Sequence, residues 1–219
     1  MRNLKIKNND SLSRKGRGSQ SGRSMIEMLG VLAIIGVLSV GGIAGYSKAM
    51  MKYRINKTIE QITLIAGNVR TFFAPQGNYA GLDLSTDTGK AIIQKAKLVP
   101  DEMLIFDRST GKITGMTSAF GESINSFGAI DKSEGIFGGD NKAFGIWFTN
   151  IPEEACVELI TYDWTSAGVK IITSPDVDTK YQYLHVPVDI DTSVKFCEDG
   201  HSFLGLLFDV DANSTYWTE

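Results

Sequence analysis

A stretch of residues without any charge lies near the start of the chain and limits what the chain can fold into. Residues 28–47 carry no charged side chain and are mostly aliphatic residues and glycine. A helix of roughly 20 apolar residues is long enough to cross a bilayer. A helix that is apolar on all sides has to be buried in lipid or in other protein. The stretch therefore predicts a helix that lies in a membrane or among copies of itself.

Glu27 stands immediately before this uncharged stretch. An ionisable side chain inside an apolar helix costs roughly 2.5–3.5 kcal/mol at the centre of a membrane, and less near an end. Two interpretations of Glu27 stay open from its position alone. In one it has a functional role, and in the other its carboxylate simply reaches the lipid headgroups.

The residues around Glu27 form a recognisable pattern. Gly22, followed by the sequence MIEML over residues 25–29 and a long apolar helix, resembles the N-terminal processing segment of type IV prepilins and pseudopilins. The resemblance implies that a prepilin peptidase cuts between Gly22 and Arg23, that Arg23 is then N-methylated, and that Glu27, five residues along, serves assembly. Arg23 departs from the family pattern, in which this position most often carries Phe or another apolar residue.

Charge is distributed unevenly along the chain. Residues 1–22 have a net charge of +5, which leaves −8 for residues 23–219 out of the total of −3. The positive-inside rule places the basic start in the cytoplasm and the remainder outside it. An acidic exported part argues against a broad nucleic-acid surface, so no nucleic-acid partner is expected. The resemblance implies other partners: the peptidase, the inner membrane, an inner-membrane assembly platform and further copies of the chain.

The helix is expected to continue beyond the uncharged stretch. Apolar residues recur at steps of three and four up to Phe73, and Pro75 and Gly77 follow, so one helix is predicted from about Met25 to Phe73. Its second half is amphipathic. The predicted apolar face includes Phe72, whereas the predicted polar face includes Gln61.

Glycines interrupt the apolar half of this helix at Gly36, Gly41 and Gly45, among other positions. Small residues four apart allow two helices to approach closely, which favours a packing role. Glycines also weaken a helix by about 1 kcal/mol each relative to Ala, which would permit local melting. The alternative is that glycine is frequent in membrane helices in general.

The remainder of the chain mixes short strands and helices. Strands are predicted over residues 103–106, 112–116, 143–149, 169–173, 183–188 and 201–210, and helices over 87–98, from an N-cap at Asn150 to about 163, and around 191–196. This pattern predicts an α+β fold with a helix packed on an antiparallel sheet. The segment IPEEACVELITYDW, residues 151–164, is similar to the corresponding part of type IVb pilins that include thin-pilus subunits. The expected division is a basic leader over 1–22, a transmembrane and assembly half-helix over 23–47, and an exported pilin domain over 48–219.

Cys156 and Cys197 are the only cysteines. An isolated pair in an exported domain favours a disulfide. Metal binding is the alternative, but neither cysteine has the close Cys or His neighbour that zinc sites require. The pilin resemblance likewise implies a disulfide-closed region near the C-terminus.

Sequence motifs for catalysis are lacking. The two histidines, His185 and His201, occupy no metal-binding or catalytic motif. Residues 209–213 begin like a calcium loop, DVDAN, but the Gly and the closing Glu of such a loop are missing. We therefore expect no enzyme, no metal and no cofactor.

The function that these observations favour is a structural subunit of a type IV pilus or a pilus-like filament, first in the inner membrane and then at the cell surface. Two alternatives stay open. One is a type II secretion pseudopilin or a minor pilin, which has the same architecture. The other is a periplasmic binding domain on a single-span membrane anchor, which would keep its basic start.

Overall fold

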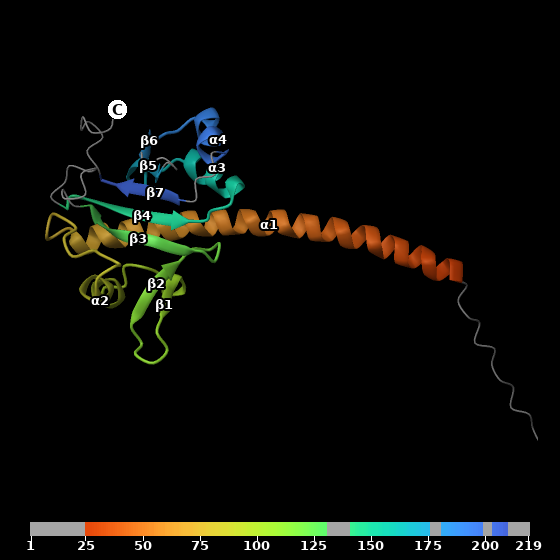
Figure 1. Cartoon of the computed structure of the whole chain (residues 1–219), viewed down its shortest axis with the longest axis horizontal. Helices are drawn as coiled ribbons and strands as arrows, with labels where there is room; N and C mark the ends of the chain where they lie inside the picture. The colour runs from red at the N-terminus through yellow and green to blue at the C-terminus, as the bar shows by residue number, and fades with distance from the viewer. Residues whose placement is uncertain (1–24, 131–140, 176–180, 199–202, 210–219) are drawn as a thin grey trace, which may run out of the picture. The chain divides into compact units, whose positions relative to one another are not determined.

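The computed structural model describes residues 25–130, 141–175, 181–198 and 203–209. The chain divides into two compact units, Met1–Tyr46 and Ser47–Glu219. Helix α1, Met25–Phe73, runs through both units, and its two halves are described in turn (Figure 1).

The first half of α1 is helical throughout from Met25, as the sequence predicts. Its large apolar side chains are between 46% and 85% exposed within the chain. An 18-residue window of the helix reaches a mean hydropathy of 2.2, and by length and composition this helix is the one in the described part of the chain that could cross a membrane.

The second half of α1 packs one face into the core of the second unit, Ser47–Glu219. Residues buried on this face are Ile55, Thr58, Gln61, Ile62, Ile65, Ala66, Val69 and Phe73. Two expectations were wrong. Gln61, predicted on the polar face, is buried because its amide donates to Glu102 Oε1 at 2.8 Å. Phe72, predicted on the apolar face, is 49% exposed and contacts the ring of Phe73 edge-on.

A seven-stranded antiparallel sheet forms the centre of this unit, in the order β1-β2-β3-β4-β7-β5-β6 (Figure 1). The strands are β1 Leu104–Phe106, β2 Ile113–Thr117, β3 Ser123–Ile130, β4 Ala143–Thr149, β5 Val169–Pro175, β6 Tyr181–His185 and β7 Phe203–Phe208. The sequence analysis missed β3, which joins the β1–β2 hairpin to the remaining strands.

Four short helical segments flank the sheet: α2 Asp87–Lys95, the 3-10 turn η1 Asp101–Met103, α3 Glu153–Thr161 and α4 Ile190–Glu198. Thr86 caps α2, and its side chain accepts a hydrogen bond from Gly89 N. The predicted cap at Asn150 was wrong. Pro152 is the N-cap of α3 and makes no side-chain cap hydrogen bond, while Asn150 lies two residues earlier in a left-handed conformation with φ 51°.

Alternating residues of the central strands belong to two different apolar clusters, one on each face of the sheet. Phe144, Ile146 and Phe148 of β4 belong to the main core, which also contains the buried face of α1. Ala143 belongs to a smaller cluster with Ile130, Ile171 and Leu207, against which Trp147 packs. Since side chains alternate along a strand, this smaller cluster lies on the sheet face turned away from α1.

Candidate functional site

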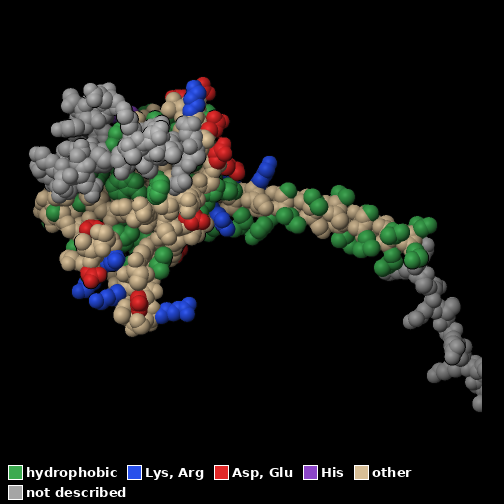
Figure 2. Space-filling view, in the orientation of Figure 1, with side chains coloured by type: hydrophobic (Ala, Val, Ile, Leu, Met, Phe, Trp, Pro, Cys, Tyr) green, Lys and Arg blue, Asp and Glu red, His purple; other side chains and the backbone are tan. Residues whose placement is uncertain are grey.

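The residues implied in processing and assembly lie at the beginning of α1. Gly22 and Arg23 fall outside the described residues. Glu27 lies in the first turn of α1, where a carboxylate complements the positive end of the helix dipole. Figure 2 shows apolar side chains along the exposed first half of the helix that follows. Within the described residues of this unit, no other segment of the chain packs over these side chains.

The glycines of this half-helix make no close contacts within the chain. A Cβ atom added at Gly36, Gly41 or Gly45 would meet nothing within 4 Å. Intramolecular packing therefore does not explain their small size. A partner outside the chain, a requirement for flexibility and the general frequency of glycine in membrane helices are the explanations that stay open.

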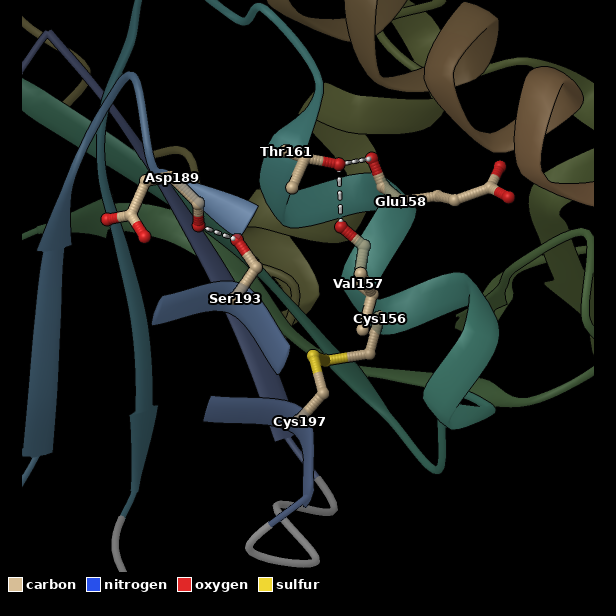
Figure 3. Close-up of a disulfide and its surroundings, with 7 residues drawn as sticks. All are labelled: Cys156, Val157, Glu158, Thr161, Asp189, Ser193 and Cys197. Atoms are coloured by element: carbon tan, nitrogen blue, oxygen red, sulfur yellow. Dashed lines mark hydrogen bonds between the residues drawn. A yellow bond between two sulfur atoms is a disulfide. The ribbon is translucent and has the colours of Figure 1, made fainter. Parts of the chain in front are cut away.

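A disulfide between Cys156 and Cys197 joins α3 to α4, with the two Cα atoms 6.0 Å apart (Figure 3). Both cysteines are buried. This confirms the predicted disulfide. It links α3 to α4, the helix that precedes the last strand, β7.

Short-range hydrogen bonds occur within each of the two disulfide-linked helices and at their ends. The Thr161 hydroxyl donates to the carbonyl of Val157 at 2.8 Å, and the Ser193 hydroxyl donates to the carbonyl of Asp189 at 2.8 Å (Figure 3). The side chain of Asp189 accepts from Thr192, and these hydrogen bonds lower the pKa of its carboxyl group. Trp164, which follows α3 and is buried, donates its indole N–H to the carbonyl of Leu159 at 2.6 Å.

Three ion-pair contacts connect the second half of α1 to distant segments, and one of them pairs Lys52 with Glu158 of α3. The other two are clusters with further hydrogen bonds. Arg70 donates through Nε and Nη2 to the two carboxylate oxygens of Asp209, each at 2.9 Å. Nearer the middle of α1, Lys57 Nζ lies 2.9 Å from Glu102 Oε1, which also accepts from Gln61. The hydrogen bonds from Gln61 and Lys57 lower the pKa of Glu102.

The sequence analysis did not identify either cluster. It placed Asp209 at the start of a candidate calcium loop. Asp211 and Asn213, the next residues of that loop with ligand side chains, lie outside the described residues. Within the described residues, no group of three or more His, Cys, Asp or Glu side chains could hold a metal ion. The pairing of Arg70 with Asp209 joins residues 139 positions apart, so no local pattern could reveal it.

The surface cavities of the unit Ser47–Glu219 include two of similar volume. One, of about 610 Å³, lies between α2 and the β1–β2 hairpin and is lined by four lysines, Lys90, Lys95, Lys97 and Lys112. The other, of about 620 Å³, lies between residues 81–89 and the strands β3 and β4. Trp147 is the aromatic residue in the lining of the second cavity.

Comparison with known families identifies the chain. Residues 48–203 match the model of the family described as Bundlin, a family of type IV pilins. The chain belongs to the Bundlin family. This Bundlin-family chain is therefore a pilin subunit, a structural protein and not an enzyme. The match confirms the family that the N-terminal pattern and the segment 151–164 indicate.

A solved structure is also similar to this Bundlin-family chain. It is described as the crystal structure of type IV b pilin from Salmonella typhi. The two share 17% sequence identity and a TM-score of 0.49, over 72% of this chain and 99% of the other. No curated protein sequence matches the chain.

Proposed function

We propose that this pilin is made as a membrane-anchored precursor and polymerises through the first half of α1 into a type IV pilus or pilus-like filament. The observation that carries the proposal is the exposure of the apolar side chains from Met25 to Tyr46. Exposed apolar area of this extent is unfavourable in water, by roughly 25 cal/mol per Å². Lipid covers it in the precursor, and helices of neighbouring subunits cover it in the filament.

Processing comes before assembly in this proposal. Prepilin peptidase cuts between Gly22 and Arg23 and removes the basic leader, and the new N-terminus at Arg23 is methylated. Residues 23–47 hold the subunit in the inner membrane until the assembly platform extracts it. Residues 48–219 lie in the periplasm and later on the outside of the filament.

Glu27 supplies the specific contact in the filament core. Its carboxylate pairs with the α-amino group at Arg23 of a neighbouring subunit, which offsets the free energy of placing either charge among apolar side chains. The pairing fixes the axial position of one subunit relative to the next. An uncompensated carboxylate in that core would be strongly unfavourable.

N-terminal sequencing of the membrane-bound chain and of sheared surface material tests both steps. We expect both samples to begin at methylated Arg23 and the sheared material to contain filaments. Glu27→Ala should leave the chain in the membrane and abolish filaments, whereas Glu60→Ala, at an exposed acidic residue of the same helix, should leave filaments unchanged. Regular filaments from Glu27→Ala, or a chain that keeps residues 1–22 and stays monomeric with peptidase and platform present, would contradict the proposal.

A further inference from the structure

A group of basic residues follows directly on the uncharged stretch of α1. Lys48, Lys52, Arg54 and Lys57 occupy four of the ten positions from 48 to 57, and residues 28–59 contain no Asp or Glu. Lys48, Lys52 and Arg54 are exposed, whereas Lys57 is half-buried. The helix surface next to the uncharged stretch therefore carries a concentrated positive charge.

The length of the uncharged stretch sets the depth of these cations relative to a bilayer. Residues 28–47 are 20 positions of α1, which extend over about 30 Å at 1.5 Å per residue. The hydrocarbon core of a bilayer is also about 30 Å thick, and the headgroup layers increase the total to about 40–45 Å. Lys48 then lies at the boundary of the hydrocarbon, and Arg54 lies about 9 Å beyond it along the helix. Long basic side chains reach polar groups from such positions, so both residues can contact headgroups.

The exposed cations point to two sides of the helix. Lys48 and Lys52 are four residues apart and are therefore neighbours on one side. Arg54 follows Lys48 by six residues, which turns its direction by about 120° at 3.6 residues per turn. Tyr53, which is 60% exposed, stands between Lys52 and Arg54 in the sequence. Tyrosine is enriched at membrane–water interfaces, where its ring sits at the level of the headgroups.

Carboxylates of the chain pair with two of the four cations. Lys52 forms an ion pair with Glu158 of α3, and Lys57 Nζ lies 2.9 Å from Glu102 Oε1. The Lys52 side chain remains 59% exposed, and an ammonium group has three donors, so it can bind a second anion. Lys57 lies about 14 Å beyond the hydrocarbon boundary, which is farther than the headgroup layer extends. The candidate site therefore consists of Lys48, Lys52 and Arg54, called here the basic collar.

Membrane orientation does not account for the basic collar. Lys and Arg are enriched on the cytoplasmic side of membrane helices, whereas the proposed function places residues 48–219 on the opposite side. Cations at this position oppose the orientation that the six Lys and Arg of residues 1–22 favour. A favourable contact with anionic groups would offset this effect, because each Lys or Arg near an anionic membrane surface strengthens binding roughly fivefold.

We propose that the basic collar binds the headgroups of anionic phospholipids in the membrane leaflet that faces the periplasm. The inference rests on the proposed function, because it takes residues 23–47 as the membrane anchor. Headgroup phosphate accepts charge-assisted hydrogen bonds from the Arg54 guanidinium and from the ammonium groups of Lys48 and Lys52. A glycerol headgroup leaves the lipid with a net negative charge, whereas the choline of a zwitterionic lipid brings a cation that the basic collar repels. The contact holds the precursor at one depth, and extraction into the filament has to break it.

Spin-labelled lipids measure this preference. The full chain is reconstituted in phosphatidylcholine vesicles, and protease digestion identifies preparations in which residues 48–219 face outwards. Spin-labelled phosphatidylglycerol or phosphatidylcholine is then added to the preformed vesicles, so that the label enters the outer leaflet only. The fraction of label that the chain immobilises gives both association constants by electron paramagnetic resonance. We expect the constant for phosphatidylglycerol to be larger by at least about threefold, and the ratio to fall in 1 M salt, which screens charges beyond roughly 3 Å.

Two double variants test the charge of the basic collar. Lys48→Gln, Arg54→Gln removes two charges, leaves the ion pair of Lys52 in place, and should lower the ratio of association constants at least about twofold. Lys48→Arg, Arg54→Lys keeps both charges and should retain the ratio.

The lysine-lined cavity beside α2 supplies the matched control. Lys90→Gln, Lys112→Gln removes the same charge from the same unit. The cavity lies far from the basic collar, since the carbonyl of Lys97 in its lining accepts from Asn68, about 30 Å farther along α1 than Lys48. This variant should leave the ratio unchanged.

The inference is overturned if the unmodified chain binds the two lipids equally, or if Lys48→Gln, Arg54→Gln leaves the ratio unchanged. An unchanged ratio together with fewer filaments would assign the basic collar to an acidic surface of a neighbouring copy instead. A chain that enters the vesicles without any lipid preference contradicts this inference alone. A chain that does not enter them contradicts the membrane anchor of the proposed function as well.

Discussion

Among single residues, Asp209 connects three separate segments of the pilin domain. It accepts both hydrogen bonds of the Arg70 guanidinium from α1 and a third from the Tyr79 hydroxyl at 2.7 Å. A guanidinium that bonds both carboxylate oxygens forms one of the stronger surface contacts. Burial and the hydrogen bond to Asp209 raise the pKa of Tyr79, so its hydroxyl keeps the proton that it donates.

Breaking this contact should destabilise the domain. We expect Arg70→Ala to lower the free energy of unfolding by about 1–2 kcal/mol, because charge-assisted hydrogen bonds are lost and both partners are only about 30% exposed. Lys97→Ala is the control. Its pair with Asp101 is 71% and 65% exposed, and the loss should stay below about 0.5 kcal/mol. Urea denaturation of the full chain measures both, and equal losses would contradict the expectation.

Gly168 adjoins the same contact and has a backbone φ of 74°. A Cβ atom at this position would lie 2.0 Å from Arg70 Nη2. We expect Gly168→Ala to cost about 1–2 kcal/mol for the left-handed backbone and a further ~1–2 kcal/mol because Arg70 is displaced from Asp209. Gly111→Ala is the matched control, since its φ is 66° and a Cβ atom there meets nothing within 4 Å. If the two alanine variants unfold at the same urea concentration, the steric argument is wrong.

Asp107 provides a pH-dependent contribution in the β1–β2 hairpin. Hydrogen bonds from the Ser109 hydroxyl and from the backbone of Thr110 and Ser109 lower its pKa from 3.8 to about 2. A lowered carboxyl pKa stabilises the fold above its ordinary pKa, and this stabilisation is lost as the pH falls from about 4 to 2. Asp107→Asn should therefore show a shallower loss of stability over this range in urea titrations at several pH values. An unchanged slope would mean that Asp107 does not contribute.

At the scale of whole elements, the disulfide determines how α3 and α4 are held together. It joins two residues that are 41 positions apart in the sequence. In the chain-entropy model a loop of this length contributes roughly 4 kcal/mol. We expect the Cys156→Ala, Cys197→Ala double variant to lose about 2–5 kcal/mol, and reduction of the unmodified chain to produce the same loss. Thiol alkylation with mass measurement confirms the redox state, and a double variant as stable as the oxidised chain would contradict this assignment.

The elements that the sequence predicted best are those with strong, continuous periodicity. Helix α1 and strand β4 have the predicted bounds, Met25–Phe73 and Ala143–Thr149. Strand β3, SINSFGAI, was missed because Ser, Asn and Gly have low strand propensity, and its place is fixed by pairing with β4 instead. Gln61 was assigned wrongly because its partner, Glu102, is distant in the sequence. Asn150 was assigned wrongly because its backbone is left-handed and the helix begins after Pro152.

The same limit applies to the candidate sites. The disulfide could be predicted because Cys156 and Cys197 are the only cysteines of the chain, and its formation is confirmed. The role of Glu27 comes from the local processing pattern and stays a prediction. The cavity with Trp147 could not be predicted, because its walls come from residues 81–89 and from strands β3 and β4. Glycines at 145 and 205 gave no local signal of their role, which depends on the indole that packs over them.

For the molecule as a whole, the proposed function requires the apolar half of α1 to serve two environments, lipid in the precursor and neighbouring helices in the filament. Gly41 and Gly45 form a pair that allows close helix approach, and no contact within the chain requires their small size. Close packing and local melting lead to opposite expectations for alanine. Packing tolerates a methyl group, whereas melting is opposed by the ~1 kcal/mol that each Gly→Ala change adds to helix stability.

We expect the Gly41→Ala, Gly45→Ala variant to assemble and the Gly41→Leu, Gly45→Leu variant to reach the membrane but yield few filaments, because the added side chains keep neighbouring helices apart. Ala33→Leu, which adds bulk to the same half-helix away from the glycine pair, is the control and should assemble. Membrane fractions and sheared surface filaments, quantified by immunoblot and electron microscopy, measure the two steps. Loss of filaments with alanine as well as leucine would favour helix melting over close packing, and normal filaments with leucine would exclude a role of this pair in either process.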